Sequence, residues 1–308
     1  MNIIREDILK ALTYFDIFHY PITKEEIRTF LNHAVQQPEF EEILAGLTGD
    51  KIIFKLDDFY SLQNDPALAE RRRKGNLLAV KEMKHAIKAA KILSKFPYIK
   101  GLAISGSLSK NYADENTDVD FFIITEANRL WIARTLLHLF YKLAWLVGKH
   151  KWFCMNYYID ERGLEIVEKN VFTAMEIVTL IPMYGAATLQ NFINANKWTK
   201  NYFPANSPDM NIAPEIKKGI FRYLPEKILN TPIGDVTDKW LMKLTRKRWE
   251  KKVLQHKVNE KGIWIGMLVG RHFSKPDPKD FQYKVVEQYN NKIAQLLPAQ
   301  NKLTIPLN

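Results

Sequence analysis

Asp118 and Asp120 are the two side chains of this 308-residue chain that are best placed to do chemistry together. Because side chains alternate across a β-strand, residues two apart point to the same face. Two carboxylates held so close repel each other unless a divalent cation lies between or beside them. Mg²⁺ typically takes one or two protein carboxylates together with phosphate oxygens of a substrate. The pair therefore predicts a magnesium site.

A Gly-Ser turn precedes this pair by a ten-residue spacer. Gly106 allows a phosphate to approach the backbone, and Ser107 adds a hydroxyl beside the N–H groups of the turn. One apolar run, 101–106, leads into the turn, and a second, 119–124, follows Asp118. Two strands would bring the phosphate-binding turn to the metal ligands, where Mg²⁺ serves as Lewis acid and template for attack on the α-phosphate of a nucleotide.

The order of apolar strand, Gly-Ser, spacer and Asp-apolar-Asp resembles the polymerase-β-like nucleotidyltransferase superfamily. The resemblance covers about residues 85 to 165. It implies a small mixed sheet flanked by helices, dependence on Mg²⁺, and transfer of a nucleoside monophosphate from a nucleoside triphosphate, with ATP as the favoured donor. It further implies that Asp118 and Asp120 are catalytic metal ligands and that Gly106 and Ser107 bind the nucleotide.

The same resemblance assigns three further residues. Lys110 stands near a position where minimal and antibiotic-modifying members often carry an arginine, so we expect it to bind the nucleotide. Members also use a third carboxylate on a following strand, and the strand predicted at 152–159 offers Asn156 in its middle and Asp160 at its end. We expect Asn156 to be the aligned position, in contact with the nucleotide, and Asp160 to be the substitute catalytic carboxylate. An amide coordinates metal poorly, so an impaired enzyme is an alternative.

The whole chain is expected to be of the α+β class, in three parts. Residues 1–64 show three helical segments and then an apolar hairpin turning at Asp57-Asp58, which is the order of a winged helix-turn-helix domain. Residues 65–170 would form the nucleotidyltransferase domain. Residues 171–308 are expected to be a mainly helical C-terminal domain.

Charge divides the chain unequally. Residues 1–64 hold six Lys or Arg against eleven Asp or Glu, and the remainder is net +16. Phosphate neutralisation dominates DNA affinity, so the acidic N-terminal domain is expected to contact protein rather than DNA. The basic blocks at 71–74 and 239–261 suggest polyanionic partners, with a solvated helix face as the alternative for the second block. The acceptor could be a small molecule, a protein or RNA.

The segment 130–148 comes close to the length of a membrane span, but Arg134, His138 and Lys142 recur along it every fourth residue. Charges at a bilayer centre are costly, so we predict an amphipathic helix and no membrane association. The three basic residues could face phosphates, although a solvated face is favoured. A single cysteine and the lack of a recognisable signal peptide favour a cytoplasmic protein.

Two functions compete with nucleotidyl transfer. One is a nucleotide-sensing or regulatory protein that acts through the winged-helix domain, and the other is modification of nucleic acid. Two further features have structural interpretations. Thr173 and Glu176 fit a capping box that opens an apolar helix. An aromatic group after Asn196 is expected to pack in the core rather than form an acceptor surface: Trp198, Tyr202 and Phe203.

Overall fold

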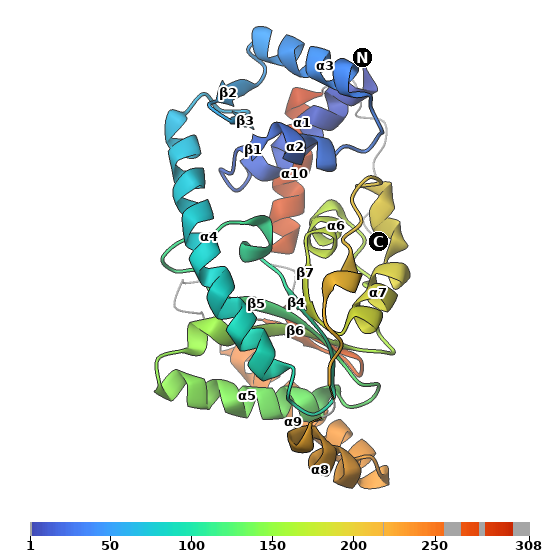
Figure 1. Ribbon diagram of the computed structural model, residues 1–308. Helices are drawn as coiled ribbons and strands as arrows, with labels where there is room; N and C mark the ends of the chain where they lie inside the picture. Colours follow the sequence, from blue (N-terminus) through green and yellow to red (C-terminus); the bar gives the residue numbers. More distant parts are fainter. Residues whose placement is uncertain (1, 218, 256–265, 277–280, 298–308) are drawn as a thin grey trace.

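A long helix, α4 (Pro66–Leu93), connects the two sheets of the computed structural model (Figure 1). The structure describes residues 2–217, 219–255, 266–276 and 281–297. Its mixture of helices with a small antiparallel sheet and a larger mixed sheet confirms the predicted α+β class.

The N-terminal part has the predicted element order of three helices and a hairpin, and a short strand adds a third member to its sheet. The elements are α1 (Ile3–Asp16), β1 (Ile22–Thr23), α2 (Lys24–Thr29), α3 (Gln37–Gly49), β2 (Phe54–Leu56) and β3 (Phe59–Ser61). Thr23 and Glu26 form the capping box at the start of α2, and Asp57 takes a left-handed conformation in the hairpin turn. Helix α10 (Gln282–Leu296) packs against α1 and extends this core.

The larger sheet has the strand order β7-β4-β5-β6-β9-β8. Its strands are β4 (Ile99–Ile104), β5 (Asp120–Thr125), β6 (Cys154–Asp160), β7 (Ile181–Tyr184), β8 (Met267–Val269) and β9 (Phe273–Pro276). Only β5 and β6 pair in parallel among these neighbours. The crossover between them is α5 (Leu130–Leu146), which buries Trp131 and Leu137 in the core. A mixed sheet flanked by helices is thus present.

The region after residue 171 contributes strands as well as helices, which the sequence interpretation did not foresee. Its helices are α6 (Val171–Val178), α7 (Ala186–Ala195), α8 (Ile220–Leu229) and α9 (Pro232–Leu254). Strand β7 pairs with β4, and β9 pairs with β6. One sheet therefore draws strands from both sides of the boundary expected at residues 170 and 171. These strands are only three or four residues long, and β7 and β9 pair with strands that are distant in sequence.

Helix α5 buries one face in the core, and its outer face carries exposed apolar side chains such as Leu139 and Leu143. Within the described residues, no helix combines the length and the apolar character that a membrane crossing requires.

The first basic block, residues 71–74, makes internal contacts. Arg71 donates to the carbonyl oxygens of Phe18 and His19 at 3.1 and 2.9 Å. Lys74 pairs with Glu70 one turn away. The Arg71 contacts tie α4 to the N-terminal part, whereas the Lys74–Glu70 pair lies within α4 at the surface.

Arg72 is the most buried member of the block. Its guanidinium donates to the carbonyl oxygen of Pro21 at 2.6 Å and to Oε1 of Glu26 at 2.7 Å, and it lies 3.9 Å from the centre of the Tyr20 ring. The side chain of Arg72 is 3% exposed. It is therefore the main polar link between α4 and the N-terminal part.

We expect Arg72→Ala to lower the free energy of unfolding by about 2 kcal/mol. Removing one partner of a buried pair costs about 3–5 kcal/mol, and the loss is smaller here because Glu26 is partly exposed and can be hydrated. Denaturant unfolding measures the change. The control is Arg73→Ala, since Arg73 pairs with Asp57 at the surface and should cost less than about 0.5 kcal/mol. Equal losses in the two variants would contradict this role for Arg72.

Candidate active site

The end of β4 and the start of β5 lie side by side and bring the Gly-Ser turn to Asp120. Ile104 is the register partner of Phe121, and the Ser105 N–H donates to the backbone oxygen of Asp120 at 3.0 Å. Val119, between the two aspartates, is buried in the core, and the aspartates lie half-buried at the N-terminal end of β5. The structure thus brings the turn to Asp120.

Gly106 is in direct contact with one of these carboxylates. Its φ is +69°, a left-handed conformation that glycine adopts without strain. A Cβ atom placed on Gly106 would lie 2.6 Å from Oδ2 of Asp120. The absence of a side chain at this position is what allows the carboxylate of Asp120 to lie against the turn.

Ser107 and Lys110 follow in the same turn. Ser107 is exposed and begins the short 3₁₀ helix η1 (Leu108–Lys110), but its hydroxyl does not cap that helix. The ammonium of Lys110 folds back over the turn and donates to the backbone oxygen of Gly106 at 3.2 Å. The turn therefore brings together four of the predicted site residues: Gly106, Ser107, Lys110 and Asp120.

Glu176 is a third acidic residue at this turn, and the sequence interpretation missed it. Its Oε1 accepts from Nζ of Lys110 at 2.7 Å, and its Oε2 accepts from the Gly106 N–H at 3.4 Å. The expected capping box with Thr173 is wrong, because α6 is capped by Asn170, whose side chain accepts from the Thr173 N–H at 3.0 Å. One feature of the sequence could have indicated Glu176, since it is the lone acidic residue in the apolar helix VFTAMEIV.

The structure does not bring Asp160 to the site. Asp160 is the register partner of Thr125, five residues along β5 from Asp120 and hence about 16 Å away. Its buried carboxylate accepts from the N–H groups of Asn128 and Arg162, both at 2.9 Å, and contacts Nδ1 of His272. These hydrogen bonds account for the burial of the Asp160 carboxylate.

The register partner of Asp120 on β6 is Cys154, and a register shift follows before Phe122 pairs with Tyr157. Asn156 lies within this part of β6, but its side chain is outside the described part of the structure. The strand thus places a thiol, rather than a carboxylate, directly beside Asp120.

The residues present fit an ion that relies on its substrate for part of its coordination. No three His, Cys, Asp or Glu side chains in the described ranges are grouped closely enough to hold a metal by themselves. Mg²⁺ does not need such a group, since one or two carboxylates and the phosphates of a nucleotide complete its coordination. Asp118 and Asp120 are the residues that would hold it.

The basic stripe of α5 does not form one solvated face. Arg134 is not on a solvated face, because its guanidinium lies 5.7 Å from the centre of the Trp131 ring and 5.9 Å from that of Tyr158. Burial lowers the pKa of Arg134. His138 and Lys142 are exposed, as expected for a solvated face.

His138 predicts a small pH dependence of stability. Burial and then the charges of Arg134, Lys142, Lys252 and Arg248 lower its pKa. The folded protein therefore resists protonation of this ring, and stability is lost as pH falls below the usual value of about 6.5. We expect His138→Gln to lose less stability than the natural chain between pH 7.5 and pH 5. The difference in thermal midpoint should be about 1 °C, since solvent screens an exposed group. Identical shifts of the thermal midpoint in both proteins would contradict this role of His138.

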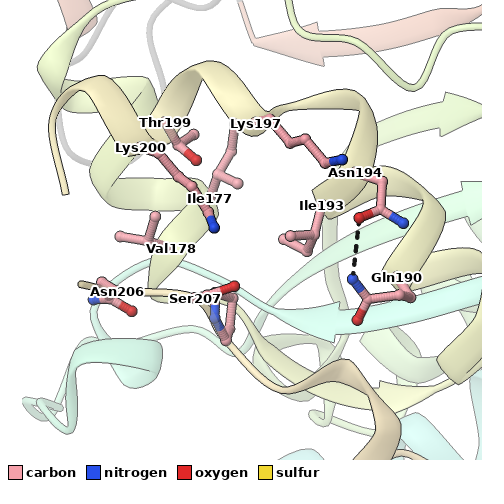
Figure 2. A pocket seen from close by; sticks show the side chains of 11 residues that line it. Ile177, Val178, Gln190, Ile193, Asn194, Lys197, Thr199, Lys200, Asn206 and Ser207 are labelled. Carbon is pink, nitrogen blue, oxygen red and sulfur yellow. Dashed lines mark hydrogen bonds between the residues drawn. The ribbon is translucent and has the colours of Figure 1, made fainter. Parts of the chain in front are cut away.

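Two hollows lie near the site but outside the turn. One pocket is formed by α6, α7 and the segment after them, where Gln190 donates to Asn194 at 3.4 Å (Figure 2). The other is an open groove between α4 and residues 112–116, lined in part by Arg71, Lys74 and Tyr112. The second adjoins the loop that connects Ser107 to Asp118.

The aromatic group after Asn196 packs in the core, as expected. Phe203 is buried, and Asn196 is fully buried with hydrogen bonds to the backbone of Ile166 and Leu164. Trp198 donates its ring N–H to the side chain of Asn196. These residues hold α7 in place and do not form an open surface.

The N-terminal part touches the turn directly. The hydroxyl of Tyr20 donates to the backbone oxygen of Lys110 at 2.5 Å, and its ring packs edge-on against Tyr112, with 5.5 Å between the centres. Residues 90 positions apart in the chain are thereby joined at the candidate site.

Comparison with known proteins does not add a relative to this description. No family model, curated protein or solved structure matches the chain.

Proposed function

We propose that this protein is a Mg²⁺-dependent nucleotidyltransferase that moves a nucleoside monophosphate from a nucleoside triphosphate, preferably ATP, to an acceptor. The observation that carries the proposal is the contact between Gly106 and the carboxylate of Asp120. It joins a turn suited to phosphate to a carboxylate pair suited to a metal. The arrangement agrees with the polymerase-β-like fold and the winged-helix domain that the sequence suggests, and we include both in the proposal.

Each residue then has a stated task. The N–H groups of the Gly106-Ser107 turn and the ammonium of Lys110 would bind the outer phosphates. Asp118 and Asp120 would hold the metal, which when bound supplies Lewis acidity at the α-phosphate. The open groove beside the loop offers the cations of Arg71 and Lys74 to an anionic acceptor. The acceptor in this proposal is a small molecule, a protein or RNA.

A binding experiment tests the proposal directly. The full chain is titrated with ATP, GTP, CTP and UTP by calorimetry, with Mg²⁺ and then with the metal chelated. We expect saturable binding of ATP that requires Mg²⁺. A chain that binds none of the four nucleotides, or binds them equally without metal, would overturn the proposal.

A sensing protein without transferase activity is the second candidate, and the position of Cys154 beside Asp120 favours it. Members of the proposed family use a carboxylate on that strand, and Asp160 lies too far along it. Incubation with ATP labelled at the α-phosphate separates the two functions. Transfer of the label to a small-molecule, protein or RNA fraction of a cell extract supports the enzyme. Tight nucleotide binding with no transfer to any fraction supports the sensor.

A further inference from the structure

The carboxylate of Glu176 accepts hydrogen bonds from the two donors that, in the proposed function, bind phosphate. The two donors are the ammonium of Lys110, at 2.7 Å from Oε1, and the N–H of Gly106, at 3.4 Å from Oε2. A carboxylate and a phosphate oxygen compete for such donors because both are anionic acceptors. The ion pair is also well shielded, with 15% of the Lys110 side chain and 28% of the Glu176 side chain exposed.

We propose that the carboxylate of Glu176 fills a polyphosphate-binding subsite, formed by Lys110 and the Gly106 N–H, and that a triphosphate must displace it. This inference rests on the proposed function only in taking the ligand to be a nucleotide. The subsite itself would bind any linear polyphosphate. Glu176 would then lower the affinity for polyanions and select ligands whose charge is high enough to outcompete it.

The geometry distinguishes this role from that of a metal ligand. Both oxygens of Glu176 accept hydrogen bonds from nitrogen donors of the turn. Oδ2 of Asp120, in contrast, lies where a Cβ atom on Gly106 would project. The described residues contain no close group of three metal-ligating side chains that would include Glu176. A metal ligand and a phosphate competitor also differ in the sign of the effect that their removal produces.

Helix α1 carries a buried donor on which the charge of Glu176 acts. The hydroxyl of Tyr14, on α1, is buried and has no hydrogen-bond partner in the described structure. Burial raises the pKa of Tyr14 well above its usual range, and the charge of Glu176 contributes to this shift. Glu176 therefore acts electrostatically on a donor that lies outside the turn. Its movement would connect the turn to the N-terminal part.

The test measures the affinity of the full chain for inorganic tripolyphosphate without metal, and for ATP with Mg²⁺, by calorimetry. Glu176→Gln keeps the shape of the side chain and removes its charge. We expect it to bind both ligands about tenfold more tightly than the natural chain, which corresponds to about 1.4 kcal/mol. Glu176→Ala should change affinity in the same direction. The matched control is Glu168→Gln, because Glu168 forms a comparable ion pair with Lys275 away from the turn and should leave both affinities unchanged.

The outcomes separate this inference from the proposed function. Unchanged or weaker tripolyphosphate binding by Glu176→Gln overturns the inference, even if Mg²⁺-dependent ATP binding upholds the nucleotidyltransferase. Tighter tripolyphosphate binding without any ATP binding upholds the subsite and overturns the nucleotidyltransferase. Failure of every protein to bind either ligand overturns both.

Discussion

Replacing Asp118 and Asp120 together by Asn is expected to abolish Mg²⁺-dependent ATP binding and to lower any transfer rate by at least about 10³-fold. The metal would contribute several kcal/mol to stabilising charge at the phosphate, and about 1.4 kcal/mol corresponds to a factor of ten. Asn preserves the size of each side chain, and the core contact of the pair is made by Val119 between them. The loss should therefore come from the missing charge rather than from unfolding.

The measurements for this variant are calorimetric ATP binding and the thermal midpoint with and without Mg²⁺. The midpoint without metal is compared with that of the natural chain, so that a loss of folding is distinguished from a loss of metal binding. Glu115→Gln is the matched control, because Glu115 is an exposed acid of the same loop. Persistence of metal-dependent ATP binding in the double variant would remove the basis for the proposed metal site.

Gly106→Ala should damage both stability and binding. The new Cβ would lie 2.6 Å from Oδ2 of Asp120 at a φ of +69°. We expect a loss of about 3 kcal/mol in the free energy of unfolding, from the left-handed conformation and the displaced carboxylate together. Because Asp120 must move away from the turn, Mg²⁺-dependent ATP binding should weaken at least about tenfold, an additional loss of about 1.4 kcal/mol.

Gly46→Ala provides the comparison for this variant. Gly46 lies inside α3, where a Cβ would meet no atom within 4 Å. Alanine is the better helix former, so that variant should gain about 0.5–1 kcal/mol. Denaturant unfolding and calorimetry on the two variants measure both effects. Normal ATP affinity in Gly106→Ala would show that the position of Asp120 against the turn does not matter for binding.

Local patterns predicted the elements that carry the candidate site. The spacing from Gly106 to Asp120 allows a pair of adjacent strands, and apolar runs on each side determine where those strands lie. The hairpin turn at Asp57 was also predicted, because it depends on residues within four positions of one another.

Contacts between distant segments could not be read in the same way. Glu176 meets Gly106 across 70 positions, and its helical spacing from Thr173 suggested a local partner that Asn170 displaces. Asp160 was separated from Asp120 by the parallel register of β5 and β6, which sequence spacing alone does not determine. The short strands after residue 171 likewise depend on pairing partners that only the folded sheet supplies.

Helix α4 limits how this protein could be assembled from separate modules. Its first two turns carry Arg71 and Arg72, which bind the N-terminal part, whereas its later residues pack on the larger sheet. A gene fusion that exchanged the N-terminal part at residue 64 would leave these arginines without their acceptors. An exchange after Lys74 would keep these arginines with their acceptors, but it would still separate α10 from α1. The two parts are therefore expected to be inherited as one unit.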